Sequence, residues 1–121
     1  MSTQATTTRR SALTAWAPVV VWAAVIFAFS AVPSLGTGLG TWDLVLRKLA
    51  HLTEYAILGV LLARATRRPV VALVLAAAYA ATDEVHQTFV EGRHGTPRDV
   101  AIDTLGALVG VCAWTWWRRR A

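Results

Sequence analysis

Long apolar runs separated by short polar segments dominate the chain. The clearest run, LTAWAPVVVWAAVIFAFSAV, is uninterrupted over residues 13–32 and has about the 20 residues that a helix needs to cross the hydrocarbon core of a membrane. Further apolar segments cover residues 44–63, 70–89 and 99–117. We therefore predict an all-α fold, a multi-pass transmembrane bundle of four helices.

The two ends of the chain differ from these runs. Residues 1–12 are polar and lack a core pattern, so we expect a flexible tail, followed by one domain over residues 13–117 and a short basic tail over residues 118–121. A cleaved signal peptide is the alternative for the first run, which is however longer than the usual apolar region of about 7–15 residues. A retained first helix is therefore favoured.

Composition supports the membrane assignment. Hydrophobic residues make up 55% of the chain, charged residues 16%, and six tryptophans are present, which departs from soluble averages. The net charge of +5 does not indicate a nucleic-acid partner, because Lys and Arg form short clusters between apolar runs and no nucleic-acid-binding motif is present. Cys112 is the one cysteine of the chain, which excludes an intramolecular disulfide. The sequence does not indicate a protein partner.

Basic residues predict how the chain lies in the membrane. Cytoplasmic segments of membrane proteins carry an excess of Lys and Arg. The basic clusters without an acidic neighbour are Arg9 and Arg10, then Arg64, Arg67 and Arg68, and finally Arg118, Arg119 and Arg120. They place the first tail, the second loop and the C-terminus on one side, so both termini are expected in the cytoplasm.

Ionisable residues of three predicted helices fall at one depth. At 1.5 Å per residue, His51, Asp83 and Asp103 lie roughly 20–23 Å from the Arg residues that anchor their helices. Lys48 and Glu84 lie within a turn of the same height. Since an ionisable side chain that faces lipid costs a few kcal/mol or more, we expect these groups to face one another or a ligand near the outer leaflet.

The 3.6-residue periodicity of a helix places further polar residues on the same helix faces as these ionisable groups. The candidate ligand-binding residues are Lys48, His51, Tyr55, Asp83, Glu84, Gln87, Arg93, Arg98, Asp99 and Asp103. Below them, Gly106 and Gly110 form a Gly-x-x-x-Gly pattern, which lets a neighbouring helix approach closely. These two glycines are expected to serve helix packing.

Two interpretations of this layer rest on its cations. Lys48, Arg93 and Arg98 can neutralise the carboxylates in a structural ion-pair network that fixes helix register. The same three residues can instead bind an anionic headgroup or phosphate, since Arg suits bidentate phosphate contacts and Lys acts as a point charge. Both interpretations remain open at the level of sequence.

Two further interpretations rest on the imidazole and carboxyl groups. His51 with Asp83 or Glu84 can form an acid-base pair, although no nucleophile motif accompanies them. A divalent metal is less favoured, because neither His51-x-x-Glu54 nor DEVH matches the His-Glu-x-x-His zinc pattern. Its candidate ligands would be His51, Glu54, Asp83, Glu84 or His86. We therefore expect no metal and no other cofactor.

Four linked motifs resemble the VanZ-like family of small bacterial membrane proteins. They are IFAFSAVP, KLAHLTEYAILG, DEVHQTFVEGR and RDVAIDTLGALVG, and they follow one another in the family's order and spacing over most of residues 25–110. The family's polar signature falls on the candidate residues above, apart from Arg98 and Asp103. Asp103 stands where the family commonly has Asn, and Glu91 stands where it often has Pro.

This resemblance implies a role at the bacterial cell envelope without a defined reaction. The family takes its name from a protein linked to resistance against the glycopeptide antibiotic teicoplanin. We accordingly expect a protein of the bacterial cytoplasmic membrane that engages an anionic lipid or a lipid-linked envelope precursor and influences teicoplanin-type susceptibility. An intramembrane enzyme that uses His51 and Asp83 is the alternative, and a structural or partner-binding helical bundle is a third class.

Overall fold

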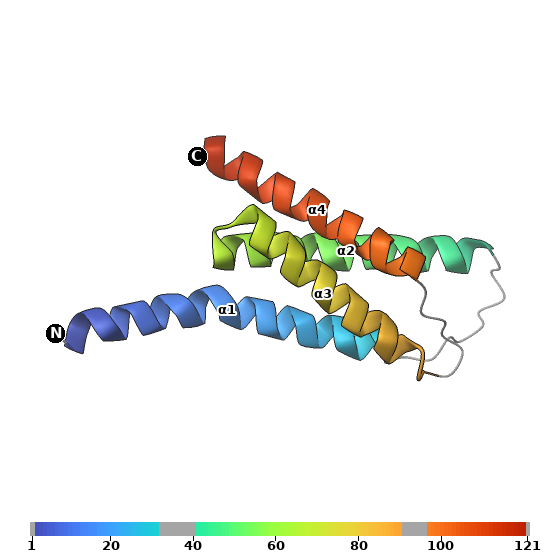
Figure 1. Cartoon of the computed structure of the whole chain (residues 1–121), viewed down its shortest axis with the longest axis horizontal. Helices are drawn as coiled ribbons and strands as arrows, with labels where there is room; N and C mark the ends of the chain where they lie inside the picture. The colour runs from blue at the N-terminus through green and yellow to red at the C-terminus, as the bar shows by residue number, and fades with distance from the viewer. Residues whose placement is uncertain (1, 32–40, 91–96, 121) are drawn as a thin grey trace.

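The computed structural model describes residues 2–31, 41–90 and 97–120, and all regular structure within these ranges is helical. The helices are α1 (Ser2–Ser30), α2 (Thr41–Thr66), α3 (Pro69–Gln87) and α4 (Pro97–Arg120). Neighbours in the sequence run in opposite directions, so the start of α1 and the end of α4 lie at the same end of the bundle (Figure 1). The predicted all-α fold is confirmed.

Helix α1 is longer than the apolar run that predicts it. It begins at Ser2, so residues 2–12 are helical in place of the flexible tail expected there. These residues contain neither Gly nor Pro, and once a helix is nucleated each further residue adds one hydrogen bond. The apolar run therefore nucleates a helix that propagates into the polar segment before it.

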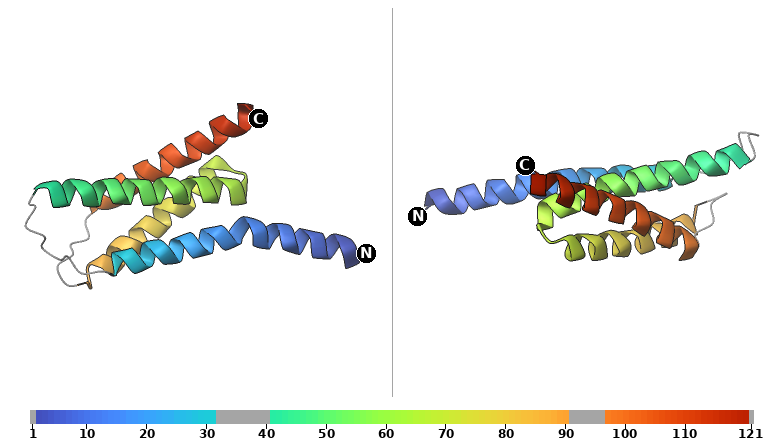
Figure 2. Two further views of the ribbon diagram at one scale, coloured as in Figure 1. Left: turned by 180° about the vertical axis from the view of Figure 1, so that it is seen from behind. Right: turned by 90° about the horizontal axis from the view of Figure 1, so that it is seen from above.

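A short turn folds α3 back along α2. Arg67 has a φ of 58°, in the left-handed region that ends a helix, and its N–H donates to the carbonyl oxygen of Ala63 at 2.9 Å. The Arg68 N–H donates to the hydroxyl oxygen of Thr66 at 3.2 Å. Pro69 then begins α3, where its missing N–H leaves no helical hydrogen bond unmade. The two helices consequently run antiparallel (Figure 2).

Glycines allow α2 and α4 to pack more extensively than any other pair of helices. A Cβ atom added to Gly106 would lie 2.7 Å from the carbonyl oxygen of Leu52. A Cβ atom at Gly59 or Gly110 would overlap the backbone of the facing helix. The backbones of α2 and α4 are therefore in direct contact, as in other membrane helix pairs with small residues at the interface.

Alanines serve the same purpose on α3. Ala72, Ala76 and Ala80 are fully buried and repeat every four residues, which places them on one face of the helix. The same face continues into Asp83 and Gln87, which are also buried. α3 thus lies close to α2 and α4 and carries its polar residues into the space between them.

Two hydrogen bonds from side chains to backbone join helix α1 to α2 and α3. The indole N–H of Trp22 donates to the carbonyl oxygen of Glu54 on α2 at 2.9 Å. The hydroxyl of Tyr79 on α3 donates to the carbonyl oxygen of Ala23 on α1. Ile26 of α1 is fully buried beside them. α1 therefore packs on the α2–α3 side of the bundle.

The described part of the molecule is apolar on the outside. Val20, Val70 and Phe89 are 65%, 74% and 84% exposed, whereas Asp83 and Asp103 are 2% and 1% exposed. Two stretches, Ser11–Ser30 of α1 and all of α4, are long and apolar enough to cross a membrane, and only 11% and 28% of their spans are buried inside the molecule. Apolar side chains outside and carboxylates inside are typical of a protein whose surroundings are hydrocarbon.

We predict that the α2–α4 contact tolerates no side chain at Gly110. Gly110→Val should lower the free energy of unfolding by about 1–3 kcal/mol or more, because the added carbons overlap backbone that cannot move aside as a side chain would. Ala113→Val is the matched control, since Ala113 is exposed one turn further along the same helix. Thermal unfolding in detergent measures the stability of both variants. Equal melting temperatures for Gly110→Val and Ala113→Val would contradict the close backbone contact between α2 and α4.

Candidate functional site

A contact between a histidine and a buried carboxylate joins α2 to α4. Nδ1 of His51 lies 3.1 Å from Oδ1 of Asp103, whose side chain is 1% exposed. Asp103 stands one turn before Gly106 on α4, and His51 stands next to Leu52, which Gly106 touches. The close approach of the two helices at Gly106 therefore brings the imidazole to the carboxylate.

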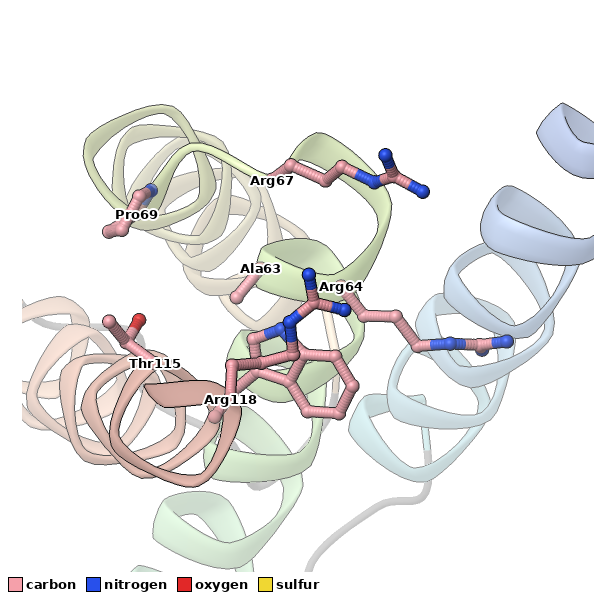
Figure 3. A pocket seen from close by; sticks show the side chains of 7 residues that line it. Ala63, Arg64, Arg67, Pro69, Thr115 and Arg118 are labelled. Atoms are coloured by element: carbon pink, nitrogen blue, oxygen red, sulfur yellow. The ribbon is translucent and has the colours of Figure 1, made fainter. Parts of the chain in front are cut away.

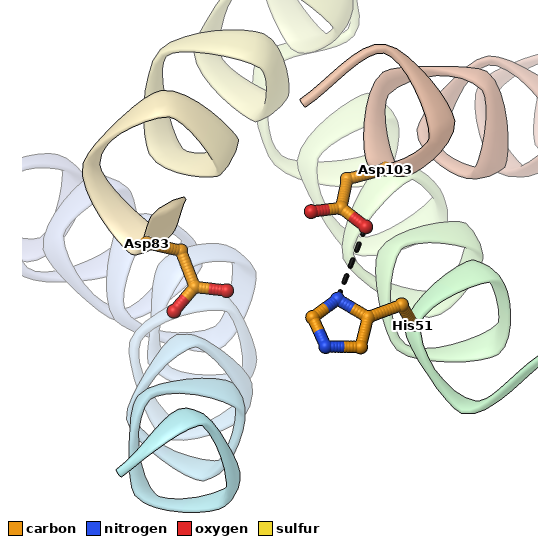
Figure 4. A group of neighbouring side chains, drawn as sticks. All are labelled: His51, Asp83 and Asp103. Carbon is orange, nitrogen blue, oxygen red and sulfur yellow. Dashed lines mark hydrogen bonds and ion pairs between the residues drawn. The ribbon is translucent and has the colours of Figure 1, made fainter. Parts of the chain in front are cut away.

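Helix α3 supplies a second buried carboxylate to the same space. The hydroxyl of Tyr55 on α2 donates to Oδ2 of Asp83 at 3.0 Å, and both residues are buried. His51, Asp83 and Asp103 each have one ligand-type atom within 4.8 Å of the other two. Figure 4 shows the three side chains extending from three helices into the space between them. We call these three residues the buried cluster.

Two oxygen atoms of the buried cluster have no hydrogen-bond partner among the described residues. They are Oδ1 of Asp83 and Oδ2 of Asp103. The other oxygen of each carboxylate accepts from Tyr55 or contacts His51. One imidazole nitrogen and two carboxylate oxygens are also a donor set that divalent transition metals accept.

A cation lies at the edge of the buried cluster. Lys48 forms an ion pair with Asp99, and their side chains are 36% and 20% exposed. Lys48 precedes His51 by three residues and Asp99 precedes Asp103 by four, so the pair lies about one turn closer to the helix N-termini. Arg98 is exposed in the first turn of α4, next to Asp99. We call Lys48 and Asp99 the rim pair.

Comparison with known proteins identifies the family. A family model described as VanZ/LLP1 matches residues 2–118. The chain belongs to the VanZ/LLP1 family. This result confirms the resemblance carried by the four motifs, and with the two apolar helices it indicates a membrane protein. Neither the comparison with curated proteins nor that with solved structures returns a significant match.

Several contacts of this VanZ/LLP1-family chain differ from the sequence expectations. His51 contacts Asp103, whereas Asp83 or Glu84 was the expected acid-base partner. Asp83 instead accepts from Tyr55. Lys48 pairs with Asp99, and the two carboxylates of the buried cluster have no Lys or Arg partner within the described ranges. Of the ion-pair network considered from the sequence, the described residues show the Lys48–Asp99 pair, and Arg93, one of its three cations, lies outside them.

The remaining candidates take other positions. Glu84 is buried beside Asp83 on α3. Gln87 is buried too, and its amide donates to Ser30 of α1 at 3.3 Å. His86, considered as a metal ligand, stacks on Phe27 of α1 with ring centroids 4.1 Å apart. Arg93 lies outside the described residues.

Sequence reasoning missed two residues that support the site. Gly59 faces α4 at the α2–α4 contact, and Ser30 is buried against Gln87. The signal for Gly59 is a row of small residues, Ala56, Gly59 and Ala63, at helical spacing on α2. Ser30 lies within the motif IFAFSAVP but was not identified as a site residue.

The opposite end of the bundle is basic. A cavity of about 210 Å³ there is lined by Arg64 and Arg67 near the end of α2 and by Trp114 and Arg118 near the end of α4. Figure 3 shows the side chains of Arg64, Arg67 and Arg118 around it. The Arg118 guanidinium carbon lies 6.0 Å from the Trp114 ring centroid. Arg64, Arg67 and Arg118 thus lie at the same end of the bundle as the chain termini, away from the carboxylates of the site.

We predict that Tyr55 stabilises the fold through Asp83. Tyr55→Phe should lower the free energy of unfolding by about 1–3 kcal/mol, because it leaves a second buried oxygen of Asp83 without a donor. In an Asp83→Leu background the same change should cost little, since the carboxylate is gone. Tyr79→Phe is the control, because the Tyr79 hydroxyl donates to a backbone carbonyl and not to Asp83. The loss of stability caused by Tyr79→Phe should therefore be the same in the wild-type protein and in Asp83→Leu. Equal losses for Tyr55→Phe in both backgrounds would refute the coupling.

Proposed function

We propose that this protein crosses the bacterial cytoplasmic membrane four times, with both termini in the cytoplasm, and that its polar site engages an anionic lipid or a lipid-linked envelope precursor in the outer leaflet. Through that ligand it influences susceptibility to teicoplanin-type glycopeptides. The observation that carries the proposal is a partly exposed lysine at the edge of a buried polar cluster in a protein with an apolar exterior.

Lys48 is the residue placed to meet an anionic group. Its ammonium is held by one carboxylate, Asp99, and its side chain is more than a third exposed, so a phosphate arriving from the membrane can reach it without unpacking a helix. Arg98 and the first turn of α4 add positive charge close by, since a helix N-terminus carries a partial positive charge. The rim pair therefore supports binding of a phosphate-bearing headgroup.

The distribution of charge supports the proposed orientation. Arginines collect at the end of the bundle that holds both chain termini, and membrane proteins place such clusters in the cytoplasm. The buried cluster and the rim pair lie toward the other ends of α2 and α4. In this orientation the polar site opens toward the outer leaflet, where envelope precursors are used.

One observation favours an intramembrane enzyme as the second candidate. The contact between His51 and Asp103 resembles the arrangement in which a carboxylate orients an imidazole for proton transfer. Asp83 lies close enough to take part. The substrate class would be the same lipid or precursor, so the two candidates differ in whether the bound molecule is changed.

Ligand retention tests the preferred candidate. Wild type purified in mild detergent should carry an anionic lipid or precursor that mass spectrometry detects. Lys48→Met should lower the amount bound about tenfold, which corresponds to loss of one charge-assisted hydrogen bond of roughly 1.5 kcal/mol. Lys48→Arg should lower it less. Arg119→Met is the control, because Arg119 is exposed at the opposite end.

The outcomes separate the candidates. Equal retention by wild type and Lys48→Met would refute binding at the rim pair. A lipid or precursor pool that changes in cells with wild type but not with His51→Ala, while retention is unaffected, would favour the enzyme. If binding produces the glycopeptide phenotype, cells with Lys48→Met should show the teicoplanin susceptibility of cells without the protein.

A topology measurement tests the orientation. Reporters fused after Arg67 and after Arg120 should be active only as cytoplasmic reporters, and a reporter fused after Val90 only as an extracytoplasmic one, because four spans place these points on alternate sides. An extracytoplasmic signal after Arg120 would overturn the proposed orientation, and with it the outer-leaflet position of the site.

A further inference from the structure

Two oxygen atoms of the buried cluster lack a hydrogen-bond partner among the described residues, and burying them in this way is energetically unfavourable. Oδ1 of Asp83 and Oδ2 of Asp103 belong to side chains that are 98% or more buried. A buried acceptor without a partner has lost its hydration without gaining a hydrogen bond, and this loss is larger when the acceptor carries charge. Native structures rarely leave such atoms unsatisfied unless an ion, a water molecule or a function accounts for them.

Both oxygen atoms belong to a set of donors with the spacing of a metal site. One ligand atom each from His51, Asp83 and Asp103 lies within 4.8 Å of the others. Zinc binds nitrogen and oxygen ligands at about 2.0–2.2 Å in a tetrahedral arrangement, so two ligands of one ion lie about 3.3–3.6 Å apart. Side-chain movements of about 1 Å are therefore sufficient to close the set around one ion.

Charge and the surrounding contacts favour a divalent cation. Two carboxylates face one imidazole, and within the described residues no Lys or Arg pairs with Asp83 or Asp103, since Lys48 is paired with Asp99. The Tyr55 hydroxyl holds the second oxygen of Asp83, as outer-shell donors commonly orient metal-ligating carboxylates. A shared water satisfies the hydrogen bonds but adds no charge, and a single shared proton offsets one of the two carboxylates, whereas a divalent ion offsets both.

We propose that His51, Asp83 and Asp103 form a binding site for one divalent transition-metal ion, Zn²⁺ or Mn²⁺, between α2, α3 and α4. A nitrogen ligand disfavours Mg²⁺ and Ca²⁺, which prefer oxygen ligands alone. Three protein ligands leave at least one coordination position for water or for a ligand group, as in catalytic rather than structural zinc sites. The site is independent of the proposed lipid ligand.

This site departs from the sequence expectation of no metal for a physical reason. Sequence motifs for metals depend on ligands at fixed spacing along one helix or loop. Here each ligand comes from a different helix, so only the packing of the three helices brings the donor atoms together.

Metal titration of the purified full-length protein tests the proposal. After treatment with a chelator, wild type in detergent should bind about one Zn²⁺ or Mn²⁺ per chain, as expected for a mononuclear site. His51→Gln and Asp103→Asn should each weaken binding by about 10-fold or more. His86→Gln should bind like wild type, since His86 stacks on Phe27 and is outside the buried cluster.

Two further readouts make the result decisive. Co²⁺ should give visible d–d absorption bands with wild type and His86→Gln that are absent from Asp103→Asn. Asp103→Asn keeps the shape of the side chain, so circular dichroism should show wild-type helix content and a failure to bind cannot be assigned to unfolding. Binding that is absent from wild type, or equal in wild type and Asp103→Asn, would overturn the site. Because no lipid is added, the result does not depend on the proposed function.

Discussion

The direct contact between the backbones of α2 and α4 determines the geometry of the rest of the molecule. Gly59, Gly106 and Gly110 leave no side chain between the two helices. His51 and Asp103 project from those helices within one turn of the Gly106 contact, and they meet at 3.1 Å. At a wider helix spacing the imidazole and the carboxylate would not touch. Packing residues therefore set the chemistry of the site, although they take no part in it.

Carboxylates buried inside a molecule with an apolar exterior make this arrangement both energetically costly and specific. A carboxylate that faced hydrocarbon would have no water to hydrate it. Asp83 and Asp103 therefore favour the helix rotations that keep their side chains inside the bundle. In a low-dielectric interior each hydrogen bond is also electrostatically stronger than in water. The polar residues consequently act together with the glycines to select one packing of the helices.

The sequence predicts the composition of this site better than its contacts. Counting residues from the arginines places His51, Asp83 and Asp103 at one depth, and the structure brings them within 4.8 Å. Depth says nothing about how each helix is rotated, and rotation decides that His51 meets Asp103 while Asp83 meets Tyr55. The four helices follow from the apolar segments, whereas the helical start of α1 does not, because a polar segment carries no periodic signal of its own.

The sign of the charge in the buried cluster decides how deep an anionic ligand can enter. Two buried carboxylates repel a phosphate, so the proposed anionic ligand would stay at the rim, beside Lys48, unless a cation offset them. A divalent ion held by His51, Asp83 and Asp103, as proposed, would offset both carboxylates and leave a coordination position for an oxygen of that ligand. The proposed ligand would then be drawn from the rim toward the ion, and His51 would act as an ion ligand in place of an acid-base partner of Asp103. The charge of a single ion would therefore decide whether the proposed ligand is bound at the rim alone or also inside the bundle.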